Sequence, residues 1–190
     1  MSRFHDAEIE RALRSMEILV DTREKKWGHI GAALDALGCP YERQKLDFGD
    51  YSFRCTYPDE SKRDFQRSIV VERKACIDEI CGNFTYGRAR FEREFQRAKE
   101  SGAEVHLMIE GADWEKVEGH AYLSRLHPAA LEGNLFSWAS RYGLRVWFCP
   151  PSFSGKLIYQ IFRYHLREML RREEDLGDAV PNTPARGFTP

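Results

Sequence analysis

Short apolar runs alternate with amphipathic helical segments along most of this chain of 190 residues, and this alternation constrains the fold more than any other feature. Residues 16–21, 68–74 and 104–110 are apolar runs of strand length. Residues 128–142, in contrast, repeat apolar side chains at helical spacing. Strands buried between amphipathic helices predict an α/β fold, in which helices cover both faces of a central sheet.

The same signals divide the rest of the chain. Turn residues, helix stops and apolar periodicity predict a helix at 27–37, strands within 41–54 around a turn at Gly49, a loop or hairpin tip at 55–67, helices at 77–83 and 88–101, a strand at 144–148 and a helix at 155–172. We expect one domain over residues 16–175. It is preceded by an N-terminal arm or short polar helix (1–15) and followed by a disordered tail (176–190).

The overall composition is that of a soluble globular protein. The net charge of −1 does not by itself indicate a nucleic-acid partner. Local basic segments at 84–101 and 155–172 are either solvated helix faces or phosphate-binding surfaces. No apolar run approaches the ~20 residues of a membrane span, so we expect a cytoplasmic protein without a membrane partner. The five cysteines include no CxxC pair, and this favours reduced thiols over a zinc site.

Acidic residues gather at the ends of the predicted strands. Glu72 and Lys74 lie two apart in the run 68–74, so they share one face of that strand and Arg73 points to the other. Taken alone, an E-x-K pair is typical of an ion pair on an edge strand. The apolar residues before Glu72 favour a central strand, where charged side chains usually have a function.

A second carboxylate beside this pair suits metal-assisted chemistry. Asp50 follows a Phe-Gly pair and is predicted to start the neighbouring strand. Asp50 and Glu72 can hold Mg²⁺ (or Mn²⁺), which prefers oxygen ligands and keeps several waters. Lys74 can orient the attacking water and counter charge that develops on a phosphate.

Three ordered segments carry a family resemblance. VDTRE (20–24), FGDY (48–51) and VERKACID (71–78) resemble the nuclease motif of the XPF family of structure-specific endonucleases, in the PD-(D/E)XK superfamily. The helix and strand expected at 87–98 and 105–111 resemble those that follow the motif. The resemblance implies a restriction-endonuclease-like fold, with a mixed central sheet flanked by helices on both faces.

The resemblance also implies a ligand set. Asp50 and Glu72 would be the main metal ligands, and Lys74 the catalytic lysine. Asp21 and Glu24 would complete the acidic cluster, binding metal directly or through water.

Four further residues match the motif or lie beside it. Arg73 and Asp78 would support catalysis, Arg73 through an ion pair or a DNA contact. Arg23 and Arg88 would bind DNA phosphates, unless they form structural salt bridges. The segment 55–67 lengthens the gap between the two acidic strands, and we read it as an enlarged hairpin tip that leaves the site in place.

These expectations converge on a metal-dependent DNA endonuclease acting on branched, flapped or recombination and repair intermediates. A non-catalytic DNA-binding scaffold of the same fold and a sequence-specific restriction or repair nuclease are the alternatives. No helix-hairpin-helix module fits after residue 149, so the chain resembles a stand-alone bacterial or phage version. A homodimer is a further possibility. The apolar helix face 157–165 can form the dimer contact or pack on the chain's own sheet.

Three tryptophans, Trp114, Trp138 and Trp147, are large apolar side chains among other apolar positions, so we expect all three in the core. His106 lies inside a predicted strand and should be buried or edge-exposed.

Overall fold

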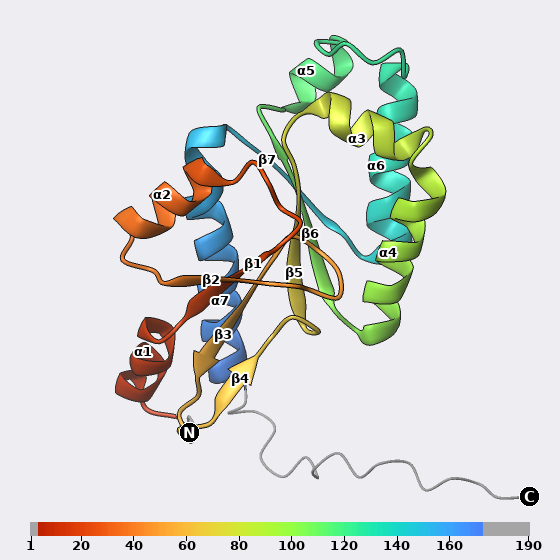
Figure 1. Ribbon diagram of the computed structural model, residues 1–190. Coiled ribbons are helices and arrows are strands. Elements are labelled where there is room, and N and C mark those ends of the chain that lie inside the picture. The colour runs from red at the N-terminus through yellow and green to blue at the C-terminus, as the bar shows by residue number, and fades with distance from the viewer. Residues whose placement is uncertain (1–3, 173–190) are drawn as a thin grey trace, which may run out of the picture.

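The structure, a computed structural model, describes residues 4–172; the predicted disordered tail lies outside them, as does the predicted domain end at 175. A single seven-stranded sheet runs through the molecule in the order β2-β1-β3-β5-β6-β7, with β4 paired to β3 (Figure 1). The strands are β1 (Glu17–Asp21), β2 (Tyr41–Gln44), β3 (Tyr51–Thr56), β4 (Lys62–Asp64), β5 (Ile69–Lys74), β6 (Glu104–Glu110) and β7 (Arg145–Cys149). Because β3 runs antiparallel to both β1 and β5 while β5, β6 and β7 are parallel, the sheet is mixed.

Helices cover both faces of this sheet, as the sequence predicted (Figure 1). One face carries α1 (Asp6–Arg14), α2 (Gly28–Ala36) and α7 (Ser154–Arg172), which follows the short 3₁₀ turn η1 (Pro151–Phe153). The other face carries α3 (Ile77–Phe84), α4 (Arg88–Ser101), α5 (Trp114–Glu118) and α6 (Pro128–Tyr142). Two separate apolar cores follow from this arrangement, one on each side of the sheet.

Strand β5 occupies the centre of the sheet. All six of its residues are buried, and it lies between β3 and β6. The central position expected for this strand is therefore confirmed. Three consecutive apolar residues, Ile69, Val70 and Val71, suit a strand that is covered on both faces.

The N-terminal and C-terminal helices pack together on one face. Residues 6–14 form a helix rather than a frayed arm, and Ile9 and Leu13 are buried in the core beside α7. The apolar face of α7, including Ile158 and Phe162, is buried in the same core. Docking of this face on the chain's own core, one of the two expected alternatives, is thus what the structure adopts.

The tryptophan prediction is correct for one residue and wrong for two. Trp138 is 1% exposed in the core between α6 and α4, but Trp114 and Trp147 are 40% and 38% exposed. Trp147 lies on β7, which pairs with a strand on one side alone among the described residues, and Trp114 lies on a short helix that the sequence did not predict.

Among residues 4–172, no helix has the length and apolar character needed to cross a membrane.

Candidate active site

Backbone pairing brings Asp50 next to Glu72. The Asp50 N–H donates to the Val71 carbonyl (2.9 Å), and Asp50 Oδ2 accepts from the Arg73 N–H (2.8 Å). Because Tyr51 pairs with Val71 in an antiparallel ladder, Asp50 comes to lie opposite Glu72. Opposed residues of such a ladder share one face of the sheet, so two sequence-distant carboxylates meet there.

Gly49 makes this close approach of the chain possible. Its φ is +71°, and a Cβ atom there would lie 2.8 Å from the Val70 Cβ. A side chain would therefore meet both backbone strain and a steric clash. The glycine that precedes Asp50 is required for the turn to lie against β5.

Lys74 is held as a cation beside both carboxylates. Its Nζ lies 2.6 Å from Glu72 Oε1 and 4.7 Å from the centre of the Phe91 ring. Burial acts to lower the pKa of Lys74, but the charges of Glu72 and Asp50 raise it above its usual value. The lysine thus donates hydrogen bonds within the site and is not a free base.

Asp50 carries an electrostatic conflict. Burial and, next, the charge of Glu72 raise the pKa of Asp50 well above its usual value, and Lys74 offsets only part of this effect. The site therefore has more negative charge than its own lysine balances. An added cation would relieve that imbalance.

These side chains open onto a polar cleft of about 570 Å³, named here the active-site cleft. The β1–α2 loop lines one side, α4 lines another, and the ends of β3 and β5 form the floor. The charged lining residues are Arg23, Glu24, Lys25, Lys26, Asp47, Asp50, Glu72, Arg73, Lys74, Glu79, Arg90 and Glu94.

Asp21, a predicted ligand, is turned away from the cleft and bound within its own loop. Its Oδ1 accepts from the Arg23 N–H and Nε–H, and its Oδ2 accepts from Arg23 Nη2 and the Leu46 N–H, all within 2.9 Å. Burial acts to raise the pKa of Asp21, yet these hydrogen bonds hold it below its usual value. Asp21 therefore fixes the loop that carries Arg23, whose half-exposed side chain lines the cleft.

Behind the site, on the opposite face of β5, lies a second group of charges, named here the rear cluster: Glu24, His29, Arg73 and Glu110. Arg73 Nη2 lies 2.6 Å from Glu110 Oε2 and Nη1 lies 3.5 Å from Glu24 Oε2, while His29 Nε2 lies 2.8 Å from Glu110 Oε1. The Arg73 side chain is 5% exposed and makes the ion pair that the sequence left as one of its two expected roles, so it supports the site from behind. Its opposite orientation to Glu72 and Lys74 agrees with the strand alternation.

Asp78 and Arg88 lie outside the cleft lining and bind the scaffold. Asp78 Oδ1 accepts from the N–H groups of Leu123 and Ser124, which anchors the loop between α5 and α6. Arg88 Nη1 donates to Asn134 Oδ1 (2.7 Å), and its guanidinium lies over the Trp138 ring. The structural salt bridge that the sequence left as an alternative is formed by Arg23, with Asp21, whereas Arg88 makes a hydrogen bond to the neutral Asn134.

Sequence reasoning named the basic segment 84–101 as a possible phosphate-binding surface, but it did not single out Arg90, Glu94, Lys25 or Lys26 as site residues. Arg90 and Glu94 lie four positions apart on α4 and both line the cleft, a spacing that places them on one helix face. Burial and the charge of Glu72 raise the pKa of Glu94 above its usual value. Lys25 and Lys26 add positive charge to the opposite wall. The helical spacing was visible in the sequence, but the direction of that helix face was not.

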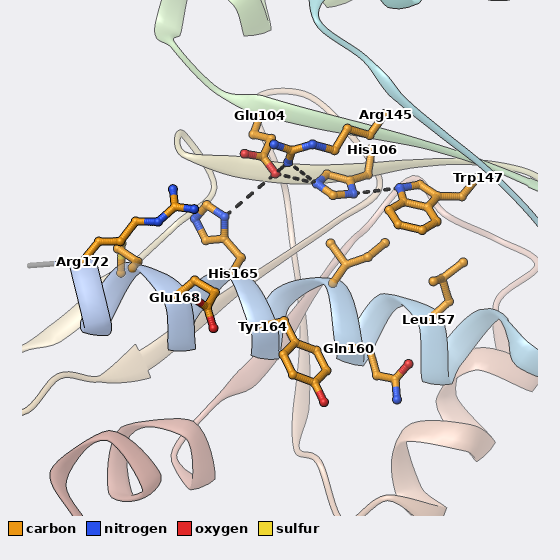
Figure 2. Close-up of a pocket in the computed structure, with 12 residues that line it drawn as sticks. Glu104, His106, Arg145, Trp147, Leu157, Gln160, Tyr164, His165, Glu168 and Arg172 are labelled. Atoms are coloured by element: carbon orange, nitrogen blue, oxygen red, sulfur yellow. Dashed lines mark hydrogen bonds and ion pairs between the residues drawn. The ribbon is translucent and has the colours of Figure 1, made fainter. Parts of the chain in front are cut away.

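A larger cavity of about 860 Å³ lies between α7 and the strands β6 and β7 (Figure 2). Trp147 Nε1 donates to His106 Nδ1 (2.9 Å), and His106 Nε2 lies 2.8 Å from Glu104 (Figure 2). Burial lowers the pKa of His106 to about 4, and burial also lowers the pKa of His165 to about 4. None of the residues proposed from the sequence as site residues lines this cavity.

Comparison with known proteins identifies the family and the fold. The ERCC4 domain model matches residues 20–161. The structure is similar to XPF from Aeropyrum pernix, with 22% identity, a TM-score of 0.60, and coverage of 80% of this chain and 66% of that one. It is also similar to the structure of that XPF in complex with DNA, at 22% identity and a TM-score of 0.55, covering 86% of this chain and 68% of that chain.

The chain spans about two thirds of the length of these solved chains, and no curated protein matches it in sequence. The family match extends from β1 into α7 and includes the cleft floor, Asp50, Glu72 and Lys74. This protein therefore belongs to the ERCC4 domain family, a family of DNA-binding nucleases, and it has the fold of the XPF nuclease domain.

Proposed function

We propose that this protein is a metal-dependent endonuclease that hydrolyses phosphodiester bonds in DNA. One observation carries the proposal: Asp50, Glu72 and Lys74 meet on one face of the sheet, at the floor of an open polar cleft. Membership of a nuclease family supports the same reading. A charge imbalance buried in the floor of a cleft is typical of a functional site rather than of a structural one.

The residues present fit a divalent metal ion, Mg²⁺ or Mn²⁺. No group of three or more His, Cys, Asp or Glu side chains within residues 4–172 encloses a ready metal cage. Mg²⁺ needs no such cage, since it keeps several waters and is commonly held by one or two carboxylates. Asp50 and Glu72 would hold it, and the excess negative charge at Asp50 favours a cation there. When bound, such an ion polarises the scissile phosphate and lowers the pKa of a water.

The chain's own residues would orient and stabilise the reacting groups. Lys74, charged and held by Glu72, can donate a hydrogen bond to a phosphate oxygen or orient the attacking water. Glu24 and Glu94 lie at the edges of the same cleft and can accept hydrogen bonds from water. Asp50 keeps one carboxylate oxygen bonded to the Arg73 N–H, which fixes its direction.

Basic residues on two walls of the cleft would grip the DNA backbone. Arg23, Lys25 and Lys26 lie on one wall and Arg90 on the other. Phosphate contacts give affinity without sequence readout, and each makes binding more sensitive to salt. We expect Arg90→Gln in an Asp50→Asn background to weaken DNA binding and to reduce the salt slope by about 1. Arg11→Gln, on the opposite face at α1, is the matched control and should change neither.

The test is cleavage of forked, flapped, nicked and four-way DNA with Mg²⁺ or Mn²⁺, compared with linear duplex and with metal removed by chelation. Wild type should cut the branched substrates, while Asp50→Ala and Lys74→Ala should not. Binding of DNA without cleavage under any metal would instead indicate a non-catalytic scaffold. Cleavage of linear duplex at fixed sequences would indicate a restriction or repair nuclease, and equal activity in the two variants would remove the assigned site.

The preference for branched DNA rests on the resemblance to XPF, and pairing of two copies rests on the same likeness. Both stay predictions for this chain. Sedimentation of the protein with and without forked DNA, run beside the cleavage panel, measures the number of copies bound.

A further inference from the structure

Two buried polar atoms in the rear cluster region have no hydrogen-bond partner among the described residues: the Tyr51 hydroxyl and Arg73 Nε. Tyr51 is 0% exposed on β3, and it pairs with Val71, so it shares its sheet face with Arg73, two residues further along β5. Buried polar atoms are almost always hydrogen-bonded, and an unpartnered one indicates a bound water or ligand. Because Arg73 is the diagonal neighbour of Tyr51 across the β3–β5 pair, the two atoms can share one occupant.

The Tyr51 hydroxyl is surrounded by charges of the site. Burial has the largest effect and raises the pKa of Tyr51; the charges of Glu24, Asp50 and Glu110 raise it further, and the charge of Arg73 lowers it. Tyr51 in turn contributes to the raised pKa of Arg73. The Arg73 guanidinium links Tyr51 to Glu24, since Arg73 lies on the same sheet face as Tyr51 and its Nη1 lies 3.5 Å from Glu24 Oε2.

Glu24 is the least firmly held acid of this region. Its Oε2 lies 3.5 Å from Arg73 Nη1, at the limit of a hydrogen bond, and its Oε1 accepts from the Lys26 N–H at 3.1 Å. The side chain lines the active-site cleft and is 11% exposed. A carboxylate can accept about four hydrogen bonds, so Glu24 has unused capacity toward Arg73.

We propose that Tyr51 is a positioning residue, whose hydroxyl and the Arg73 Nε–H hold one buried water that hydrogen-bonds to the Glu24 carboxylate and fixes it at the cleft. A buried water needs two to four polar partners, and these three groups supply them. The inference rests on the proposed function, because it assigns Glu24 to the metal-binding side of the cleft.

A purely structural role does not explain the hydroxyl. Phenylalanine would fill the same space in the core without burying an oxygen, and burying a hydroxyl without a partner is unfavourable. The aromatic ring alone satisfies the packing of Tyr51 among its apolar neighbours. The proposed water, which links the Tyr51 hydroxyl to Glu24, gives the hydroxyl oxygen a hydrogen-bond partner and a role.

The experiment is a double-mutant cycle on Mn²⁺ affinity, measured by calorimetry on the whole chain. Tyr51→Phe should weaken Mn²⁺ binding by about tenfold, the size expected when a supporting residue behind a ligand is removed. In a Glu24→Gln background the same substitution should change affinity by less than about twofold, because its route to the metal is already lost. Tyr142→Phe, whose hydroxyl bonds Glu92 (2.9 Å) outside the cleft lining, is the control and should leave affinity unchanged.

Unchanged affinity in Tyr51→Phe would overturn the inference, and so would an equal loss in both backgrounds. Thermal unfolding without metal is the second measurement. Removal of a water-bonded hydroxyl should lower the melting temperature by about 3 °C, whereas an unchanged or higher value would contradict the shared water. If the wild type binds no Mn²⁺, the proposed function fails, and the unfolding result still decides on the water.

Discussion

Each face of strand β5 holds a buried carboxylate, Glu72 on one and Glu110 on the other, but the charges around them are balanced differently. On the cleft face, Asp50 and Glu72 share one cation, Lys74, and the pKa of Asp50 is raised by burial and by Glu72. On the rear face, burial also acts to raise the pKa of Glu110, but hydrogen bonds from Arg73, Ser154 and His29 hold it below its usual value. The Asp50 carboxylate thus lies beside uncompensated negative charge, whereas the Glu110 carboxylate is stabilised by its hydrogen-bond donors.

This difference separates the proposed functional cluster from the supporting one. Burial alone does not mark a functional site, because both faces contain carboxylates that are 8% exposed or less. In the rear cluster, both carboxylate oxygens of Glu110 have a partner, one from His29 and one from Arg73, and these contacts stabilise the end of β5. The cleft face keeps a negative excess beside solvent, where an added cation can bind.

The largest expected effect is on catalysis at the cleft face. Lys74→Met should reduce the single-turnover cleavage rate of forked DNA by about 10³-fold, because the donor to the reacting groups is lost. DNA affinity, measured by anisotropy, should change by less than about threefold, since cleft-wall residues supply most phosphate contacts. A cleavage rate within tenfold of the wild-type rate would show that catalysis does not take place on the cleft face.

The rear face should respond in stability rather than in rate. Glu110→Gln leaves the Arg73 guanidinium buried without its main counter-charge, so the free energy of unfolding should fall by about 3 kcal/mol. Urea unfolding at neutral pH measures it, with Glu118→Gln on α5 as the control. A loss below about 0.5 kcal/mol would show that the rear cluster does not support the strand.

Metal addition should distinguish the faces directly. At one hundred times its dissociation constant, Mg²⁺ should add about 2.7 kcal/mol to the stability of both wild type and Glu110→Gln. Asp50→Asn should gain far less. An equal gain in all three proteins would locate the ion elsewhere.

The smallest expected effect has the opposite sign to that of Glu110→Gln. Without metal, Asp50→Asn removes the like-charge contact with Glu72, so unfolding free energy should rise by about 1 kcal/mol. The amide oxygen can still accept from the Arg73 N–H. Differential scanning fluorimetry beside Asp35→Asn, an exposed control on α2, checks the sign; a destabilised Asp50→Asn would contradict a conflict at this carboxylate.

The alternation of side chains along a strand was enough to predict which charged residues of β5 lie on which face. An apolar run ending in Glu-Arg-Lys fixes Glu72 and Lys74 on one face and Arg73 on the other, and the structure has this arrangement. The alternation of strands and helices likewise predicted a two-sided sheet. Local periodicity carries such information because it depends on neighbours within one segment.

What the sequence did not reveal depends on contacts between distant segments. Glu110 meets Arg73 only because β6 lies parallel beside β5, and no local pattern states that register. The contact of Asp21 with Leu46 likewise requires the loop after β2 to return to β1. Trp147 is partly exposed because β7 lies at the edge of the sheet among the described residues. The apolar sequence of β7 does not indicate this edge position.

The most direct test of the central claim is anomalous diffraction from a crystal of the wild-type protein grown with Mn²⁺. The account predicts a peak about 2.1 Å from a carboxylate oxygen of Asp50 and from one of Glu72, with Lys74 Nζ within hydrogen-bond reach of the same site. A peak bound elsewhere, or no peak at saturating Mn²⁺, would contradict it.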